Sequence, residues 1–382
     1  MKKVLMMASV ASMIDLFNMD NVKILQNMGF EVHVACNFEY GSITSQERVD
    51  EFCEELEHSG IKIFQLPVPR SISAIKGIIK SYKLMKKLCQ ENHYQIVHCH
   101  SPIGGVIARL ACKSERKNGT KVIYTAHGFH FFKGASIKNW MLFYPIEKLC
   151  AKYTDCLITI NKEDFIRAKK FKAKKVEYVP GIGIHTEDIK NLKVDRKTKR
   201  AEFGFQDNDF VLISVGQLSK RKNQEVIIKA LAGISDKHVK LLICGLGEFE
   251  EYLKNLTKKL HLEGRVIIAG YRSDVKKLLY AADCLAFPSY QEGLPVALME
   301  AMSAGLPAVC SKIRGNTDLI EDGKGGYLVE PDDVEGFANS INKIIENETL
   351  KENMGKYNRK EIFKFDINNV KKDMENIYLS LK

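Results

Sequence analysis

Short apolar runs alternate with longer amphipathic stretches along the first half of the chain. The apolar runs occupy positions 3–7, 31–36, 61–64, 96–99, 122–124 and 156–160. Runs of this length, separated by helical patterns, are typical of strand–helix–strand units in a parallel sheet. The first half is therefore predicted to form a doubly wound α/β domain.

The same alternation restarts in the second half, with apolar runs at positions 210–216, 239–244, 266–268, 284–287 and 307–310. Between the halves, Val179-Pro180-Gly181-Ile182-Gly183 places proline and glycine where a hinge needs them. We predict domains at 1–182 and 183–366, and a final helix at 367–382 that packs back on the first domain. Because ligands of open parallel sheets bind beyond the carboxyl ends of strands, the site is expected in a cleft between two facing sheets.

Composition narrows the class of protein. The 382 residues are 45% hydrophobic and 27% charged, which suits a globular rather than a disordered chain. The formal charge of +11 favours an anionic partner, such as nucleic acid, a phosphorylated substrate or an anionic lipid surface, although a solvated lysine-rich surface explains it equally well. Ten cysteines without CxxC spacing indicate buried thiols in a reducing cytosol. No apolar stretch approaches the ~18 residues of a membrane span, and the first run is interpreted as a strand rather than a signal peptide.

The sharpest chemical signal lies at residues 288–302. Here a strand ends, Gly293 supplies a tight turn, and a helix is expected to begin near Pro295. The free amides of the first helical turn then point at an anion beyond the strand end. Glu292 lies in the turn and Glu300 on the helix, so the two carboxylates can hold separate hydroxyl groups of one ligand.

Glu292 and Glu300 resemble the E-x7-E motif of the retaining glycosyltransferase family 4, and the resemblance covers nearly the whole chain. It implies the GT-B fold, with two Rossmann-like domains facing across a cleft. It also implies that Glu300 holds the ribose of a nucleotide and that Glu292 holds the transferred sugar. The neighbouring backbone assigned to the donor is that of Gly293, Leu294 and Val296.

A second signal follows the strand at 210–216, where Gly216 precedes three consecutive cations, Lys220 to Lys222. The family usually shows G-R-x4-K-G at this point. Lys222 matches the lysine, whereas Gln217 replaces the arginine and Asn223 the glycine. How the phosphate charge is balanced is therefore open, and Arg221 is the candidate to compensate. The turns that the resemblance places beside the base and ribose contain Gly245, Tyr271 and Arg272.

In the first half, His127 follows a strand, and the resemblance assigns it to the donor sugar or the leaving diphosphate. His98 and His100 share one face of another strand, but two histidines are too few for a zinc site. The residues expected on the acceptor side are Asp15, Asn18, His100 and His130.

Asp207-Asn208-Asp209 spells DxD, a metal-binding motif of another glycosyltransferase fold. It precedes a strand and so lies at the wrong end of the predicted sheet. We interpret it as a turn and expect no metal and no cofactor.

A basic amphipathic helix is predicted near residues 75–89. Apolar positions from Ile75 to Cys89 form one face, and Lys76, Lys80, Lys83 and Lys87 form another stripe. Such a helix, with the aromatic stretch at 129–144, is typical of a protein that binds an anionic membrane surface. Core packing beneath a solvated lysine face is the alternative.

Taken with its likeness to bacterial capsule and exopolysaccharide enzymes, the chain is expected to be a retaining hexosyl- or N-acetylhexosaminyl-transferase. It would move a sugar from a UDP-sugar to a polyprenyl-diphosphate-linked saccharide at the cytoplasmic face of the membrane, without binding nucleic acid. A sugar-nucleotide epimerase of the same fold and a non-catalytic polysaccharide-assembly subunit are the alternatives. The sequence argues against a nicotinamide oxidoreductase, because no GxGxxG follows the first strand.

Overall fold

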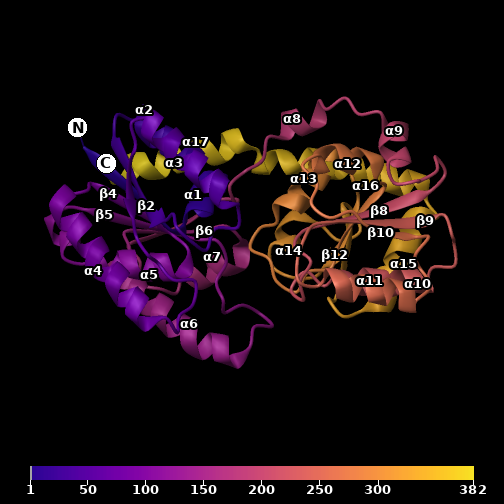
Figure 1. Cartoon of the computed structure of the whole chain (residues 1–382), viewed down its shortest axis with the longest axis horizontal. Coiled ribbons are helices and arrows are strands. Elements are labelled where there is room, and N and C mark those ends of the chain that lie inside the picture. Colours follow the sequence, from indigo (N-terminus) through magenta and orange to yellow (C-terminus); the bar gives the residue numbers. More distant parts are fainter. Residues whose placement is uncertain (1) are drawn as a thin grey trace. The chain divides into compact units, whose positions relative to one another are not determined.

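The computed structural model describes residues 2–382, which form two compact units. The N-terminal unit runs to Ile182 and includes residues Asn368–Lys382, and the C-terminal unit is Gly183–Ile367. In each unit, helices cover both faces of one sheet (Figure 1).

The N-terminal unit contains a seven-stranded sheet in the order β3-β2-β1-β4-β5-β6-β7, with every neighbouring pair parallel. From β1 the chain builds the sheet outward on one side through β2 and β3, and from β4 it builds on the other side. The position between β1 and β4 is the switch point at which open α/β sheets bind their ligands. The strands are β1 (Lys3–Val10), β2 (Glu31–Asn37), β3 (Lys62–Gln65), β4 (Ile96–His100), β5 (Lys121–Ala126), β6 (Cys156–Thr159) and β7 (Lys175–Tyr178).

Two apolar layers enclose this sheet, because successive strand residues point to opposite faces. Val4 and Met6 of β1 pack under the first three helices and the last one, whereas Leu5 and Met7 pack on the other side. The helices are α1 (Ala11–Phe17), α2 (Met19–Asn27), α3 (Gln46–His58), α4 (Ile75–Asn92), α5 (Pro102–Ala111), η1 (Glu115–Asn118), α6 (Ile137–Cys150), η2 (Ala151–Tyr153), α7 (Lys162–Ala168) and α17 (Ile367–Leu381).

The C-terminal unit repeats the design with six parallel strands in the order β10-β9-β8-β11-β12-β13. These are β8 (Phe210–Val215), β9 (Val239–Cys244), β10 (Val266–Ile268), β11 (Cys284–Phe287), β12 (Ala308–Ser311) and β13 (Gly326–Val329). The helices are α8 (Thr186–Lys190), α9 (Arg196–Ala201), α10 (Gln224–Gly233), α11 (Glu250–Lys259), α12 (Val275–Ala281), α13 (Val296–Ala304), α14 (Asn316–Leu319), α15 (Val334–Ile345), α16 (Glu348–Glu361) and η3 (Ile362–Phe365).

The prediction of two Rossmann-like α/β halves is confirmed, and the structure adds the edge strands β7 and β13. Both edge strands are partly exposed, so their sequences lack the continuous apolar run that marks a buried strand. Among residues 2–382, no helix combines the length and the apolar character needed to cross a bilayer.

Helix α4 buries less of its apolar face than the sequence predicts. Met85, Leu88 and Cys89 are buried, but Ile75 and Ile79 near its start are 63% and 49% exposed. The expected apolar face is therefore fully buried only along the second half of the helix, while Ile78 and Tyr82 pack against the core and stay partly exposed.

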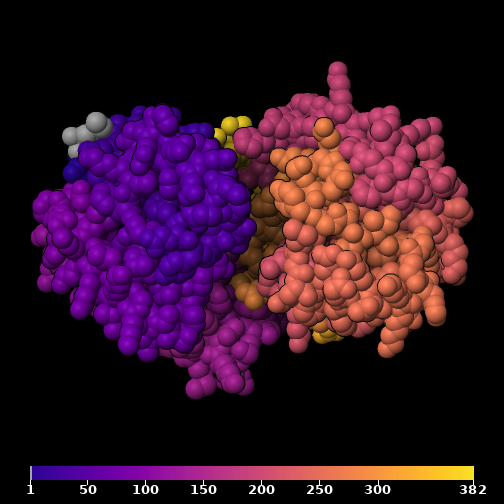
Figure 2. Space-filling view, in the orientation of Figure 1, coloured from indigo at the N-terminus to yellow at the C-terminus, as the bar shows by residue number. Residues whose placement is uncertain are grey.

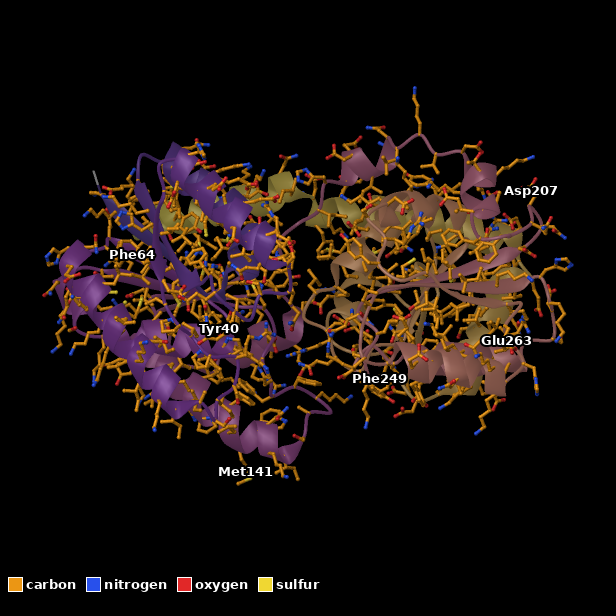
Figure 3. The ribbon with its side chains drawn as sticks, viewed as in Figure 1. Tyr40, Phe64, Met141, Asp207, Phe249 and Glu263 are labelled. Atoms are coloured by element: carbon orange, nitrogen blue, oxygen red, sulfur yellow. The ribbon has the colours of Figure 1, made fainter. Side chains whose placement is uncertain are left out.

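The aromatic stretch at 129–144 largely packs inward, which is the core-packing alternative. Phe129 and Phe131 are buried and stacked 4.7 Å apart, and Trp140 packs against the same core. The large hydrophobic side chains that α6 exposes are not aromatic, with Ile137 at 77% and Met141 at 74%. Met141 points away from the sheet, and the α6 segment protrudes at the lower edge of the N-terminal unit (Figures 2 and 3).

Candidate active site

Glycine turns bring the carboxyl ends of β8 and β9 close together in the C-terminal unit. Gly216 and Gly245 follow these strands with φ of 146° and 152°, a conformation that L side chains rarely adopt. A Cβ atom on Gly245 would lie 1.9 Å from the carbonyl oxygen of Gly216. These two positions therefore require glycine for the backbones to approach each other.

Lys222 and Glu292 meet at this end of the sheet although 70 residues separate them in sequence. The Lys222 Nζ donates to Glu292 Oε1 at 2.8 Å, and both side chains are largely buried. Burial lowers the pKa of Lys222, while the Glu292 carboxylate acts to raise it. The pair places an ammonium and a carboxylate at fixed positions beside the strand ends.

The loop before α10 holds Lys222 and its neighbours in place. Asn223 adopts the left-handed conformation, with φ of 56°, that a glycine would otherwise supply. Its side-chain amide donates to the carbonyls of Pro288 at 3.1 Å and Pro331 at 2.8 Å. Replacement of the family's glycine by Asn223 therefore keeps the turn and ties it to the loop that follows β11.

Arg221 lies beside Lys222 at the same carboxylate. Its Nη1 donates to the Gln291 carbonyl at 2.7 Å and lies 3.3 Å from Glu292 Oε1. Arg221 therefore supplies a guanidinium beside Lys222, whereas position 217 carries glutamine in place of the family's arginine. The contribution of Arg221 to diphosphate binding stays a prediction. Gln217 itself is exposed, and its carbonyl accepts from Gln224 Nε2 at 3.1 Å.

Glu300 lies on α13, eight residues after Glu292 of the preceding turn, and its side chain is 18% exposed. Burial raises its pKa above the ordinary value, against the weaker opposing effect of Lys276, whose Nζ lies 3.8 Å away. Val296 is the first residue of α13, so its amide belongs to the first helical turn as expected. A partly buried carboxylate whose only ion pair within residues 2–382 is this long contact with Lys276 is suited to accepting hydrogen bonds from hydroxyl groups.

Sequence reasoning missed Arg314, which follows β12. Its Nε donates to the Glu292 carbonyl at 3.1 Å, and the side chain is buried. The next residue, Gly315, has φ of 80°, and a Cβ there would lie 2.5 Å from the Gly293 carbonyl oxygen. An arginine–glycine pair shortly after a buried strand was the available signal.

The residues predicted to lie beside the nucleotide base are more exposed than Glu292 and Lys222. Tyr271 is 73% exposed. Arg272 is held in ion pairs with Asp274 at 2.8 Å and Glu202 at 2.9 Å. The assignment of these residues to a nucleotide stays a prediction.

The Asp207-Asn208-Asp209 sequence occupies a turn at the start of β8. Asp207 and Glu263 lie at one end of the C-terminal unit, where β8 and β10 begin, and Phe249 lies at the other (Figure 3). Asp209 accepts from the backbone N–H of Gln206 at 2.8 Å. Within residues 2–382, no three His, Cys, Asp or Glu side chains are grouped to hold a metal ion.

Three histidines gather at the ends of β4 and β5 in the N-terminal unit. His98 Nδ1 lies 2.8 Å from the Tyr378 hydroxyl of α17, and the His98 and His100 rings are 4.2 Å apart. His100 Nδ1 lies 3.1 Å from Nε2 of His127. Burial lowers the pKa of His98 to about 3 and that of His127 to about 4, and it lowers the pKa of His100 in the same direction.

The neighbours of His100 fix which nitrogen of His127 carries the proton. His100 Nε2 lies 3.2 Å from the sulfur of Met6, which can only accept a hydrogen bond. His100 therefore carries its proton on Nε2 and accepts through Nδ1, so His127 donates from Nε2. The Nδ1 of neutral His127 is then an acceptor for a hydroxyl group of a ligand.

The other residues predicted on the acceptor side lie in different surroundings. His130 stacks on Phe143 with ring centroids 4.5 Å apart and lines a pocket of the N-terminal unit. Asp15 forms a bidentate pair with Arg48, at 2.7 and 3.0 Å. Asn18 is buried and donates to the Met13 carbonyl at 2.8 Å. Asp15 and Asn18 thus have structural partners and do not line the pocket, and His100 contacts His127.

Comparison with known proteins agrees with both halves of the fold. Residues 195–361 match the family model of glycosyl transferases group 1, and residues 3–161 match the model glycosyl transferase 4-like. The Bacillus subtilis protein EpsD, described as a glycosyltransferase, is 37% identical over 382 residues, spanning 99% of this chain and 96% of EpsD.

Two further comparisons extend this result. The UDP-Gal:alpha-D-GlcNAc-diphosphoundecaprenol alpha-1,3-galactosyltransferase of Escherichia coli is 30% identical over 87% of this chain and 84% of that enzyme. The crystal structure of Anabaena Alr3699/HepE in complex with UDP and glucose superposes with a TM-score of 0.77 at 22% identity, covering 100% of both chains. The resemblance predicted from Glu292 and Glu300 is confirmed at the level of family and fold. The chain therefore belongs to the group 1 glycosyltransferases and has the GT-B fold, with an N-terminal half of the glycosyl transferase 4-like type.

Proposed function

We propose that this glycosyltransferase moves a hexose or N-acetylhexosamine from a UDP-sugar to a lipid-diphosphate-linked saccharide, with retention of configuration, in surface polysaccharide synthesis. The observation that carries the proposal is the Lys222–Glu292 pair with Glu300 behind it, at the carboxyl ends of β8 and β11. The E. coli relative, which acts on GlcNAc-diphosphoundecaprenol, supports the class of acceptor.

The chemistry assigns a separate task to each group. Glu300 accepts hydrogen bonds from the ribose hydroxyls, and Lys222 with Arg221 balances the diphosphate charge. Glu292 and the first amides of α13 hold the transferred sugar, and His127 accepts from one of its hydroxyls through Nδ1.

In the transfer step, the bond from the sugar C1 to the diphosphate oxygen breaks as the acceptor oxygen bonds to C1 from the same face. The acceptor proton passes to the departing diphosphate, so the step requires no protein base. The ammonium of Lys222 stabilises the charge that develops on this leaving group.

An anionic membrane surface is the proposed place of reaction. Lys76, Lys80, Lys83 and Lys87 are all exposed on α4. Exposed aliphatic side chains on α6 add apolar area, which together with basic residues suits peripheral binding.

A donor panel tests the function. The purified protein is incubated with individual UDP-sugars and a lipid extract of bacterial membranes, and the products are identified by mass spectrometry. We expect one lipid-linked saccharide to gain the mass of a single hexose or N-acetylhexosamine. Isomerisation of the donor without an acceptor would instead indicate an epimerase.

A further inference from the structure

A pocket of about 350 Å³ lies within the N-terminal unit, at the carboxyl ends of its strands. Ser9 at the end of β1 and Ser101 directly after β4 both line it, so it lies at the switch point of the sheet. None of the residues from the sequence-predicted donor site contributes to it. Its volume falls in the usual range for a small-molecule site.

The lining of the pocket has one charge. Arg70 contributes a guanidinium, and no aspartate or glutamate is among the lining residues. Its Nη1 donates to the backbone carbonyl of Gly41, which holds the side chain at the wall. Among the described residues no carboxylate pairs with Arg70, so its remaining donors suit an anionic ligand.

Most of the remaining wall is hydrocarbon. Met13 and Phe17 come from α1, Ile103 from α5 and Phe143 from α6. The lining residues Ile43 and Ile72 are 70% and 45% exposed, which marks them as the apolar mouth of the pocket. Beyond Ile72, the exposed side chains at the start of α4 continue the apolar surface outward.

We propose that this pocket binds the diphosphate and the first isoprene units of the lipid carrier of the acceptor, with the diphosphate on Arg70 and the chain leaving past Ile43 and Ile72. The anionic head of such a lipid suits a pocket whose lining contains Arg70 and no carboxylate. Its branched hydrocarbon tail suits the apolar mouth. The choice of ligand rests on the proposed function, but binding of the ligand can be measured without any transfer reaction.

The single tryptophan of the chain provides the readout. Trp140 lies on α6, three residues before Phe143 of the pocket wall, and it packs against the core of the unit. Farnesyl diphosphate, kept below its micellar concentration, is titrated while the Trp140 fluorescence is recorded. Farnesol and inorganic diphosphate are titrated as ligands that carry only one of the two features.

We expect farnesyl diphosphate to bind at least about tenfold more tightly than either partial ligand, since charge-assisted bonds and apolar burial then act together. Arg70→Gln should weaken farnesyl diphosphate about tenfold and leave farnesol within about twofold. The double variant Ile43→Ser/Ile72→Ser should remove the advantage over inorganic diphosphate. Lys117→Gln, an exposed cation in η1 before β5, serves as the control and should match the wild type.

Equal binding of farnesol and farnesyl diphosphate, unaffected by Arg70→Gln, would show a plain hydrocarbon pocket and overturn the proposal. If inorganic diphosphate bound as tightly as farnesyl diphosphate, the proposal that the pocket binds the isoprene chain would be overturned. Arg70→Gln should also raise the KM for a saccharide on a lipid diphosphate, but not for the same saccharide on a neutral alkyl chain. If the protein binds farnesyl diphosphate as expected and transfers no sugar, the proposed function fails while this site stands.

Discussion

His98, His100 and His127 remain neutral because their burial disfavours the charged form of each ring. His98 contacts two hydroxyl groups, those of Tyr378 and Thr125, each at 2.8 Å. His100 in turn contacts His127. His127 is thus backed by a layer of neutral side chains, and protonation of this cluster in acid should destabilise the fold.

Replacement of His98 by glutamine should flatten the dependence of stability on pH. The pKa of His98 is about 3 in the folded protein, below the 6.5 of the unfolded chain. Between these values only the unfolded chain binds the proton, so His98 lowers stability by on the order of 1 kcal/mol for each pH unit below 6.5 and has no effect above it. Urea unfolding of the wild type and His98→Gln at pH 7, 6 and 5 measures the difference in slope.

The solvent-exposed His58 on α3 provides the control for this experiment. His58→Gln should keep the slope of the wild type, because the His58 side chain lies on the surface and outside the buried cluster. Identical slopes for His98→Gln and the wild type would show that His98 does not limit stability in acid.

At the scale of elements, the close approach of the ends of β8 and β9 requires glycine at Gly216 and Gly245. Gly245→Ala should weaken nucleotide binding and lower stability by about 2 kcal/mol or more, because the new Cβ would lie 1.9 Å from the Gly216 carbonyl oxygen at a φ of 152°. Thermal unfolding and UDP titration measure both effects.

Gly233→Ala is the matched control, since Gly233 ends α10 and a Cβ there has nothing within 4 Å. It should leave UDP binding unchanged and stability equal or slightly higher, as alanine favours helix. If the two alanine variants behave alike, close approach of the β8 and β9 ends is not needed at Gly245.

These elements also show how far sequence reasoning extends. The central strands were predicted because each is a continuous apolar run buried on both faces. The edge strands β7 and β13 carry weaker patterns and were missed. The motif around Glu292 and Glu300 identified the family, but its pairing with Lys222 depends on tertiary structure across 70 residues. The pocket around Arg70 combines the ends of β1 and β4 with residues from separate loops and helices, and it has no local motif.

At the scale of the whole molecule, the basic face of α4 is expected to hold the protein on anionic membranes. Each lysine near such a surface contributes about 1 kcal/mol, and the attraction decays over a Debye length of about 8 Å. Reversing Lys76, Lys80, Lys83 and Lys87 to glutamate should release the protein from anionic vesicles in a sedimentation assay, as added salt should for the wild type. UDP binding should be unchanged, because α4 lies in the N-terminal unit.

Two smaller charge reversals separate the position of the charges from their number. Lys80→Glu/Lys83→Glu on α4 should weaken vesicle binding more than Lys258→Glu/Lys259→Glu on α11, whose lysines are also exposed. Equal loss in both variants would mean that net charge, and not the α4 face, governs the association.

Transfer activity should persist in EDTA. Lys222 and Arg221 supply positive charge at the proposed diphosphate site, and Asp207 and Asp209 lie at the opposite end of the sheet. Initial rates with and without EDTA measure this directly. Loss of activity that magnesium or manganese restores would require a metal ion in the mechanism.

The central claim, a nucleotide site at Glu300 and a sugar site at Glu292, is tested most directly by calorimetric titration of UDP into three proteins. The wild type should bind UDP, and Glu300→Gln should bind it about ten- to a hundredfold more weakly, since hydrogen bonds to a charged group are lost. Glu292→Gln should bind UDP within about threefold of the wild type, because UDP lacks the transferred sugar. Unchanged affinity in folded Glu300→Gln, or no UDP binding by the wild type, would contradict the account.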